Sequence, residues 1–115
     1  MKVPLHAIAH GRAGDKGDTS NISVVAFRPE AWPAIREQVT ERRVLDLFRP
    51  LGATVVTRYE LPRLCALNLV VENALDGGVN CSLGVDRHGK GLSFLLLTLE
   101  IEATGDMLPK NSPYR

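Results

Sequence analysis

The sequence predicts a single α+β domain in which helices cover one face of a mainly antiparallel sheet. The chain has 115 residues, which is the size of one domain and enough to bury a core without disulfides or metals. Apolar residues make up 44% and charged residues 23%, as is ordinary for a globular protein. Stretches with strand-like alternation are separated by shorter stretches with helical spacing and helix caps, which is the pattern of an α+β layout.

The N-terminal third is predicted to hold two strands joined by a long loop. Residues 3–9 alternate along a first strand, and residues 21–27 form a second strand rich in β-branched side chains. The glycine-rich residues 10–21 between them are expected to form the loop. That length is unusual for a hairpin connection, and long ordered loops often carry function.

Two helical segments are predicted after the second strand. The first opens at residues 28–30, where a proline suits the first turn, and Pro33 lies close enough to break or restart it. Thr40 is predicted to be the N-cap of a second helix over residues 41–48. A proline and a glycine within residues 50–52 are expected to end that helix.

The second half of the chain is predicted to contain one helix and several strands. Residues 63–75 are predicted as helix because Leu64, Leu67 and Val71 fall at helical spacing. Residues 69–71 also fit a strand, so both interpretations stay open here. The remaining elements are expected to be strands and a polar turn, over residues 53–61, 79–85, 92–102 and 86–91.

The last predicted strand is apolar on both faces, with Leu95 and Leu97 on one side and Phe94 and Leu96 on the other. A two-layer domain leaves one sheet face in water, so we expect a second copy or another protein to cover it, and we predict a homo-oligomer. The domain is expected to span residues 1–102. Residues 103–115 are expected to form an extended tail that lies across a neighbouring subunit or a partner.

Composition also excludes several function classes. The net charge is +1, and no basic stripe with interleaved aromatic residues is present, so no nucleic-acid partner is expected. The apolar run at residues 92–99 is far shorter than the about 20 residues that span a bilayer, so no membrane partner is expected either. The N-terminus lacks the apolar segment of a signal peptide, and the expected location is cytoplasmic. Cys65 and Cys81 are not in a C-x-x-C pair and are expected to be free thiols.

The glycine-rich segment is the candidate ligand site. Its glycines allow close approach to the backbone, and Arg12 and Lys16 are suited to a phosphate or a carboxylate. Asn68 is a polar residue in an apolar stretch, and a buried amide needs partners. Solvated charges paired within the loop remain the alternative. The predicted anion-binding residues are Arg12, Gly14, Asp15, Lys16, Gly17, Asn21 and Asn68.

Patterns for catalysis and for metal binding are weak, and neither a metal nor a cofactor is expected. His6 and His10 are four residues apart, but in a strand-to-loop region this spacing does not place them on one face. No G-x-S-x-G elbow or Walker phosphate loop is present. Arg58 and Glu60 alternate on a predicted strand and are expected to pair for structural reasons. The chain is therefore predicted not to be catalytic on its own.

Three separated blocks resemble one family, the AtuA-like small domain of acyclic terpene utilisation proteins. The blocks are Arg12-Ala13-Gly14-Asp15-Lys16-Gly17-Asp18 with Asn21-Ile22, then Arg58-Tyr59-Glu60-Leu61-Pro62 with Ala66-Leu67-Asn68-Leu69-Val70, then Leu75-x-Gly77-Gly78-Val79. The resemblance implies a ferredoxin-like two-layer α+β fold, with about five mainly antiparallel strands and two helical regions on one face. It also implies a place in the bacterial breakdown of acyclic terpenoids or related acyl-CoA compounds.

In that family the domain occurs at the C-terminus of a larger protein or as a separate small protein beside one. The resemblance therefore favours an accessory or interaction subunit of a larger AtuA-type protein. The alternative is a small anion- or acyl-CoA-binding module, or an enzyme, that acts through residues 10–21.

Overall fold

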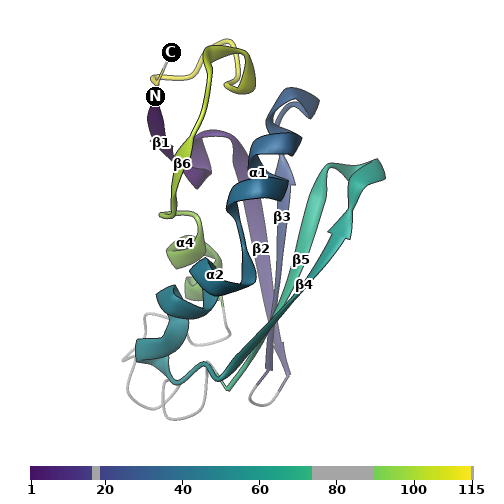
Figure 1. Ribbon diagram of the computed structural model, residues 1–115, viewed down its shortest axis with the longest axis vertical. Helices are drawn as coiled ribbons and strands as arrows, with labels where there is room; N and C mark the ends of the chain where they lie inside the picture. Colours follow the sequence, from purple (N-terminus) through teal and green to yellow (C-terminus); the bar gives the residue numbers. More distant parts are fainter. Residues whose placement is uncertain (17–18, 74–89, 115) are drawn as a thin grey trace.

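The computed structural model describes residues 1–16, 19–73 and 90–114 and shows an α+β domain (Figure 1). A four-stranded antiparallel sheet has the strand order β2-β3-β5-β4, and β1 and β6 form a separate antiparallel pair. The strands are β1 Lys2–Pro4, β2 Ala9–Lys16, β3 Thr19–Ala26, β4 Val55–Leu61, β5 Ala66–Glu72 and β6 Glu100–Glu102. The helices are α1 Trp32–Gln38, α2 Glu41–Phe48 and α4 Lys90–Leu96.

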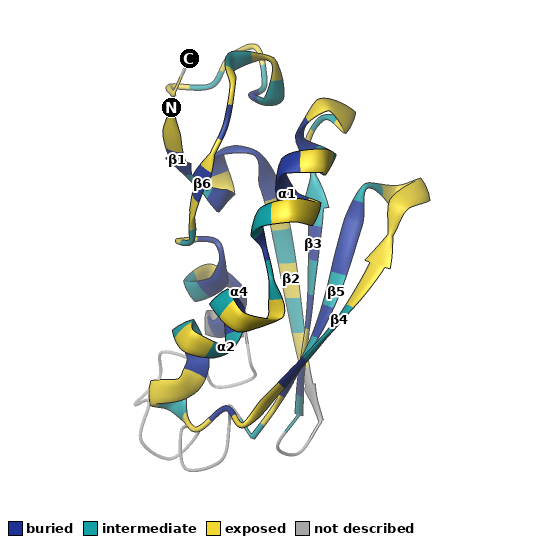
Figure 2. Ribbon diagram, viewed as in Figure 1, coloured by how far each residue is buried: buried dark blue, intermediate teal, exposed yellow. Residues whose placement is uncertain are grey.

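The helices lie on one side of the four-stranded sheet together with the β1–β6 pair, and no described element covers the other side (Figure 1). The core lies between these two layers (Figure 2). Alternate residues of the central strands face it and are fully buried, namely Ile22, Val24, Leu67, Leu69 and Val71. Side chains of the helix layer meet them, with Ile35, Val44, Phe48 and Leu96 fully buried. The predicted arrangement, helices on one face of an antiparallel sheet, is confirmed.

Helix α2 forms where the sequence predicts it. The Thr40 hydroxyl accepts a hydrogen bond from the Arg43 amide at 3.2 Å, which satisfies one of the free amides of the first turn. Val44 and Phe48, four residues apart, point into the core. After a 3-10 turn, Gly52 adopts a φ of 101°, which only glycine reaches without strain.

Side chains of the helix layer are bonded to the main chain of β6. The Gln38 amide donates to the Glu102 carbonyl at 2.8 Å and accepts the Glu102 amide at 2.7 Å. Arg43 donates to the Gln38 carbonyl at 3.0 Å and to the Glu100 carbonyl at 2.7 Å. These bonds join α1, α2 and β6 through charge-assisted and paired amide contacts.

The prediction of a strand at residues 3–9 followed by a loop is wrong. The chain forms β1, then a 3-10 turn at Leu5–Ala7, and β2 begins at Ala9. Residues 9–16 pair with β3 along their whole length. The glycines suit this strand because a Cβ on Gly11 would lie 3.2 Å from the Ser23 carbonyl oxygen and 3.6 Å from Leu97. The strand thus passes close beneath the layer that contains α4.

The prediction of a helix at residues 63–75 is also wrong over its described part, and the strand alternative is the correct one. Residues 62–64 form a 3-10 turn, Cys65 takes a left-handed φ of 51°, and β5 follows. Leu67, Leu69 and Val71 alternate into the core between β3 and β4. Residues 74 and 75 lie outside the described part.

Residues 92–102 are not one long strand. Helix α4 occupies the first part of this run, as far as Leu96, and β6 is confined to Glu100–Glu102. Leu92 and Leu96, four residues apart, are buried, whereas Phe94 is 71% exposed. The apolar residues that were expected on two faces of a strand therefore lie on the buried and exposed sides of α4 and in the segment that follows it. The predicted strand at 79–85 and residues 86–89 of the predicted turn lie outside the described residues, and residues 90–91 of that turn begin helix α4 instead.

The segment after β6 contacts its own domain. It contains a 3-10 turn at Gly105–Met107, and Leu108 is fully buried in the core cluster. Arg28 donates from Nε to the Asp106 carbonyl at 3.1 Å. This part of the chain was expected to be extended and to lie across a neighbour. Instead, the side chain of Leu108 packs within its own domain. None of the described helices is long and apolar enough to cross a membrane.

Candidate functional site

The uncovered face of the four-stranded sheet is the candidate site, and we call it the open face. Residues paired directly across antiparallel strands project to the same side, so the register defines rows across the sheet. One row contains Arg12, Ser23, Asn68 and Tyr59. The next row contains Gly14, Asn21, Val70 and Thr57. Because the alternate residues of β3 and β5 are buried in the core, these two rows lie on the side away from the helices.

The open face brings together predicted site residues that the sequence placed on different elements. Arg12 and Gly14 come from β2, Asn21 from β3 and Asn68 from β5. They were expected on a loop and on a helix, and they instead occupy two adjacent rows of one sheet. The side chains of Asp15 and Lys16, together with all of Gly17 and Asp18, lie outside the described part of the chain.

Asn68 has an unsatisfied side chain at the centre of this face. Its Oδ1 is buried and accepts no hydrogen bond within the described structure. Leaving such a group without a partner costs about 1–3 kcal/mol.

Arg12 is exposed and, within the described residues, forms no ion pair or hydrogen bond. Gly14, the next residue on the same side of β2, has nothing within 4 Å of the place where a Cβ would lie. The guanidinium is a planar donor suited to a carboxylate or a phosphate. This end of the open face thus offers an exposed cation, with no described ion-pair partner, beside unfilled space.

Apolar side chains are exposed at the β4 end of the rows, opposite Arg12. On β4, Val55 is 46%, Tyr59 53% and Leu61 40% exposed. Phe27, just after β3, is 47% exposed but lies at the opposite edge, where its ring is 5.6 Å from that of His10 on β2 and lines a hollow shared with His6 and Tyr114. Exposed apolar groups gathered on one surface, beside polar ones, are typical of an interaction site. The sequence did reveal this set, since Val55, Thr57, Tyr59 and Leu61 alternate, but it did not show that they point away from the core.

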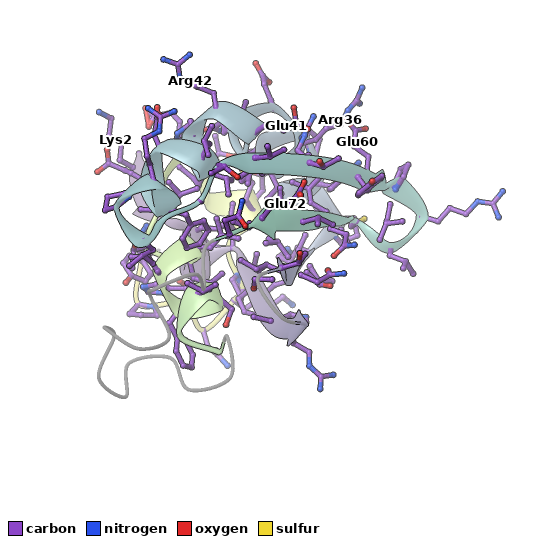
Figure 3. All side chains as sticks on the ribbon, turned by 90° about the horizontal axis from the view of Figure 1, so that it is seen from below. Lys2, Arg36, Glu41, Arg42, Glu60 and Glu72 are labelled. Carbon is purple, nitrogen blue, oxygen red and sulfur yellow. The ribbon has the colours of Figure 1, made fainter. Side chains whose placement is uncertain are left out.

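The polar residues on the other side of β4 have structural partners. Arg58 and Glu60 pair at 3.0 Å, as predicted, and Glu60 also contacts Arg36 at 3.3 Å. Arg58 further donates to the Arg36 carbonyl at 2.7 Å and to the Val39 carbonyl at 3.4 Å, where α1 ends. Its amide donates to the Glu41 carboxylate at 2.8 Å. Figure 3 shows Arg36, Glu41 and Glu60 gathered along this edge of the sheet.

Two shallow hollows lie beside these elements. One, of about 390 Å³, is lined by Pro33, Arg36, Glu37, Arg58 and Glu60, so most of its charges already neutralise one another. The other, of about 430 Å³, lies between the 3-10 turn after β1 and the C-terminal segment. There the rings of His6 and Tyr114 meet edge to face at 6.0 Å.

The residues weighed for metal binding and nucleophilic catalysis do not converge in the described structure. His6 contacts Tyr114 and His10 contacts Phe27, and no group of three His, Cys, Asp or Glu side chains suited to a metal occurs among the residues described. Cys65 is a free, half-buried thiol at the turn before β5, and Cys81 lies outside the described ranges. Ser20 is buried and donates to the Gly14 carbonyl at 3.3 Å.

Comparison with known protein families gives one match. The family model of the AtuA ferredoxin-like domain matches residues 3–102, which is nearly the whole chain. No curated protein and no solved structure matches the chain.

Proposed function

This chain belongs to the AtuA ferredoxin-like domain family, and on that premise we propose that it is an accessory subunit that docks onto a larger AtuA-type protein. The open face is the proposed docking surface. The observation that carries the proposal is the coincidence on one uncovered sheet of exposed apolar side chains and an exposed arginine that has no ion pair among the described residues.

The size of the open face is compatible with a specific interface. Four strands at about 4.8 Å spacing and seven residues at about 3.4 Å rise cover a face of roughly 19 by 24 Å. A partner that covers it would bury about 450 Å² of planar area on each side, or about 900 Å² in total before surface roughness is counted. That is below the about 1,200–2,000 Å² of stable specific complexes and in the range of weak, transient ones. We therefore expect reversible association, with Tyr59, Val55 and Leu61 of β4 as the apolar contacts.

The process in which such a complex would act is the bacterial breakdown of acyclic terpenoids or related acyl-CoA compounds. Family membership supports this context, and the cytoplasm is its expected location. In this proposal the larger protein carries the chemistry and the small chain supplies a binding surface.

The test is direct binding to the larger AtuA-type protein of the same organism. Both proteins are purified, mixed and measured by size exclusion with light scattering and by calorimetric titration. We expect a complex of summed mass, and we expect Tyr59→Ser to weaken it about tenfold or more. Phe94→Ser is the matched control, because Phe94 is an aromatic on the helix side that is even more exposed, at 71% against 53% for Tyr59. Equal weakening by both changes, or no complex with the wild type, would contradict the proposal.

In the absence of the larger protein, we expect copies of the chain to associate through the same apolar face. The basis for this expectation is now the exposed row on β4, since residues 90–96 form a helix. Light scattering of the pure protein measures it. A clean monomer at micromolar concentration, unchanged by Tyr59→Ser, would rule self-association out.

A second candidate function is the binding of a small anion or the acyl-CoA phosphates by Arg12. The exposed guanidinium, which has no ion pair among the described residues, and the open space above Gly14 favour it. Calorimetric titration of phosphate, simple carboxylates and coenzyme A into the wild type and into Arg12→Ala tests it. Binding heat that Arg12→Ala abolishes would support this function, and no heat with any of these ligands would exclude it.

A further inference from the structure

We propose that Glu41 blocks the outer edge of β4 and so prevents two copies of this chain from pairing β4 to β4 in one continuous sheet. The inference concerns an edge of the four-stranded sheet and not its open face. It goes beyond the proposed function and would stand even if no larger protein bound the chain. The partner that Glu41 excludes is a second copy, joined by main-chain hydrogen bonds.

Strand β4 is the last strand of the described four-stranded sheet, and β5 lies on one side of it. In an antiparallel pair, every second residue directs its N–H and C=O groups away from the partner strand. The Arg58 amide bonds to Glu41 and not to β5, so the residues of this outward set are Val56, Arg58 and Glu60. A row of this kind at a sheet edge is a template for a further strand.

Glu41 occupies the middle of this row. Its Oε2 accepts a hydrogen bond from the Arg58 amide at 2.8 Å, and an ionised acceptor makes such a bond strong. Glu41 is the first residue of α2, and the cap at Thr40 fixes the start of that helix beside β4. Figure 3 shows Glu41 with Arg36 and Glu60 along this edge. Because Arg58 is the central residue of the outward set, any strand that paired with two adjacent residues of the set would need the amide that Glu41 holds.

A second copy of β4 would fit this edge if the amide were released. Most residues of the strand are β-branched or aromatic, and Val55, Tyr59 and Leu61 are exposed. When two copies pair antiparallel with their Tyr59 residues opposite each other, Arg58 of each copy lies opposite Glu60 of the other. Opposite charges and aromatic rings placed directly across two strands both stabilise a sheet. Each chain offers one β4, so this pairing closes as a twofold dimer.

The experiment compares the mass of the whole chain with that of its variants by light scattering over a range of concentrations. Glu41→Ala removes the acceptor and is expected to give about twice the mass of the wild type at the same concentration. Glu41→Gln keeps an acceptor oxygen and is expected to keep the wild-type mass. Glu37→Ala is the matched control, because it removes an exposed carboxylate from α1 and changes the net charge equally.

Two further measurements locate the contact. The Glu60 amide points outward, so Glu60→Pro removes an edge donor without removing a bond to β5. The double variant Glu41→Ala/Glu60→Pro is therefore expected to return to the wild-type mass. In dilute Glu41→Ala, the Arg58 amide should exchange its hydrogen about tenfold faster than in the wild type, and it should become protected again as the mass doubles. The emission of Trp32, which packs against the core, shows whether each variant is folded.

Several results would overturn the inference. An unchanged mass for Glu41→Ala does so directly. An equal rise in mass for Glu37→Ala would assign the effect to net charge, and an equal rise for Glu41→Gln would show that the hydrogen bond is not the cause. A rise that persists with Glu60→Pro, or that leaves the Arg58 amide unprotected, would place the association elsewhere on the chain. None of these results bears on docking to the larger protein, which Tyr59→Ser tests.

Discussion

Replacing Arg58 with methionine tests how the helix layer is held against the edge of the sheet. The guanidinium donates to the Arg36 carbonyl at 2.7 Å and to the Val39 carbonyl at 3.4 Å, and it pairs with Glu60 at 3.0 Å. These carbonyls end α1, where no further helical amide is available to them. Methionine keeps much of the aliphatic volume and removes every donor.

The magnitude follows from these contacts. A hydrogen bond to a charged group contributes about 1.5–3 kcal/mol, and the Arg58 side chain is only 20% exposed, so solvent screening is limited. Water can reach the freed carbonyls in part, which places the expected loss at about 2 kcal/mol. With an unfolding entropy of about 0.24 kcal/mol/K for 115 residues, the melting temperature should fall by about 8 °C.

Urea unfolding followed by the fluorescence of Trp32 gives the free energy, and calorimetry gives the melting temperature. Trp32 is the single tryptophan and packs against the core, so its emission reports on the helix layer. Arg42→Met is the control, because Arg42 is 81% exposed and pairs only with Asp46 within α2. The control should lose less than about 0.5 kcal/mol. A loss from Arg58→Met no larger than that of the control would refute the reasoning.

Three further changes test other parts of the fold. Gly11→Val should lower the free energy of unfolding by about 1–3 kcal/mol, because a Cβ there would lie 3.2 Å from a backbone oxygen. Gly14→Val faces open space and should change the free energy of unfolding by less than about 0.5 kcal/mol. Equal effects of the two variants in urea unfolding would contradict the packing described. Thr40→Ala should lose about 1 kcal/mol and Thr40→Ser almost none, measured by thermal unfolding, and a neutral alanine variant would mean that the cap contributes nothing. Leu108→Ala should lose about 2–4 kcal/mol in the isolated chain, since the side chain is fully buried in its own domain; an unchanged melting temperature would show that this segment is not part of the core.

The candidate site could be predicted from the sequence as a set of residues but not as a surface. Arg12, Gly14, Asn21 and Asn68 were singled out by residue type, and the structure places them in two adjacent rows. Their convergence depends on β5 lying beside β3, which is a pairing between residues more than forty positions apart in the chain. No local pattern encodes such a pairing. The same holds for the direction in which Tyr59 points, because alternation identifies two faces and does not say which one the helices cover.

Local sequence determined those elements whose signals are local. Helix α2 has a cap at Thr40, a buried pair four residues apart and a glycine at its end, and each of these acts within a few residues. Strand β3 and strand β4 carry β-branched or alternating residues that favour an extended chain. For these segments the backbone preference and the burial pattern agree, so the sequence alone predicts them.

Tertiary structure decided the segments in which two periods fit the same residues. Over residues 64–71, Leu64, Leu67 and Val71 fit a helix, while Leu67, Leu69 and Val71 fit a strand. Only a strand can pair with both β3 and β4, and β5 does so. Around α4 the run of leucines fits a strand with two apolar faces, yet a helix buries Leu92 and Leu96 against the sheet and leaves Phe94 outside. Backbone preferences differ by less than about 1 kcal/mol per residue, whereas burying one leucine contributes about 1.5–3 kcal/mol. Where the local pattern is ambiguous, the core therefore selects the element, and it does so through contacts that are distant in sequence.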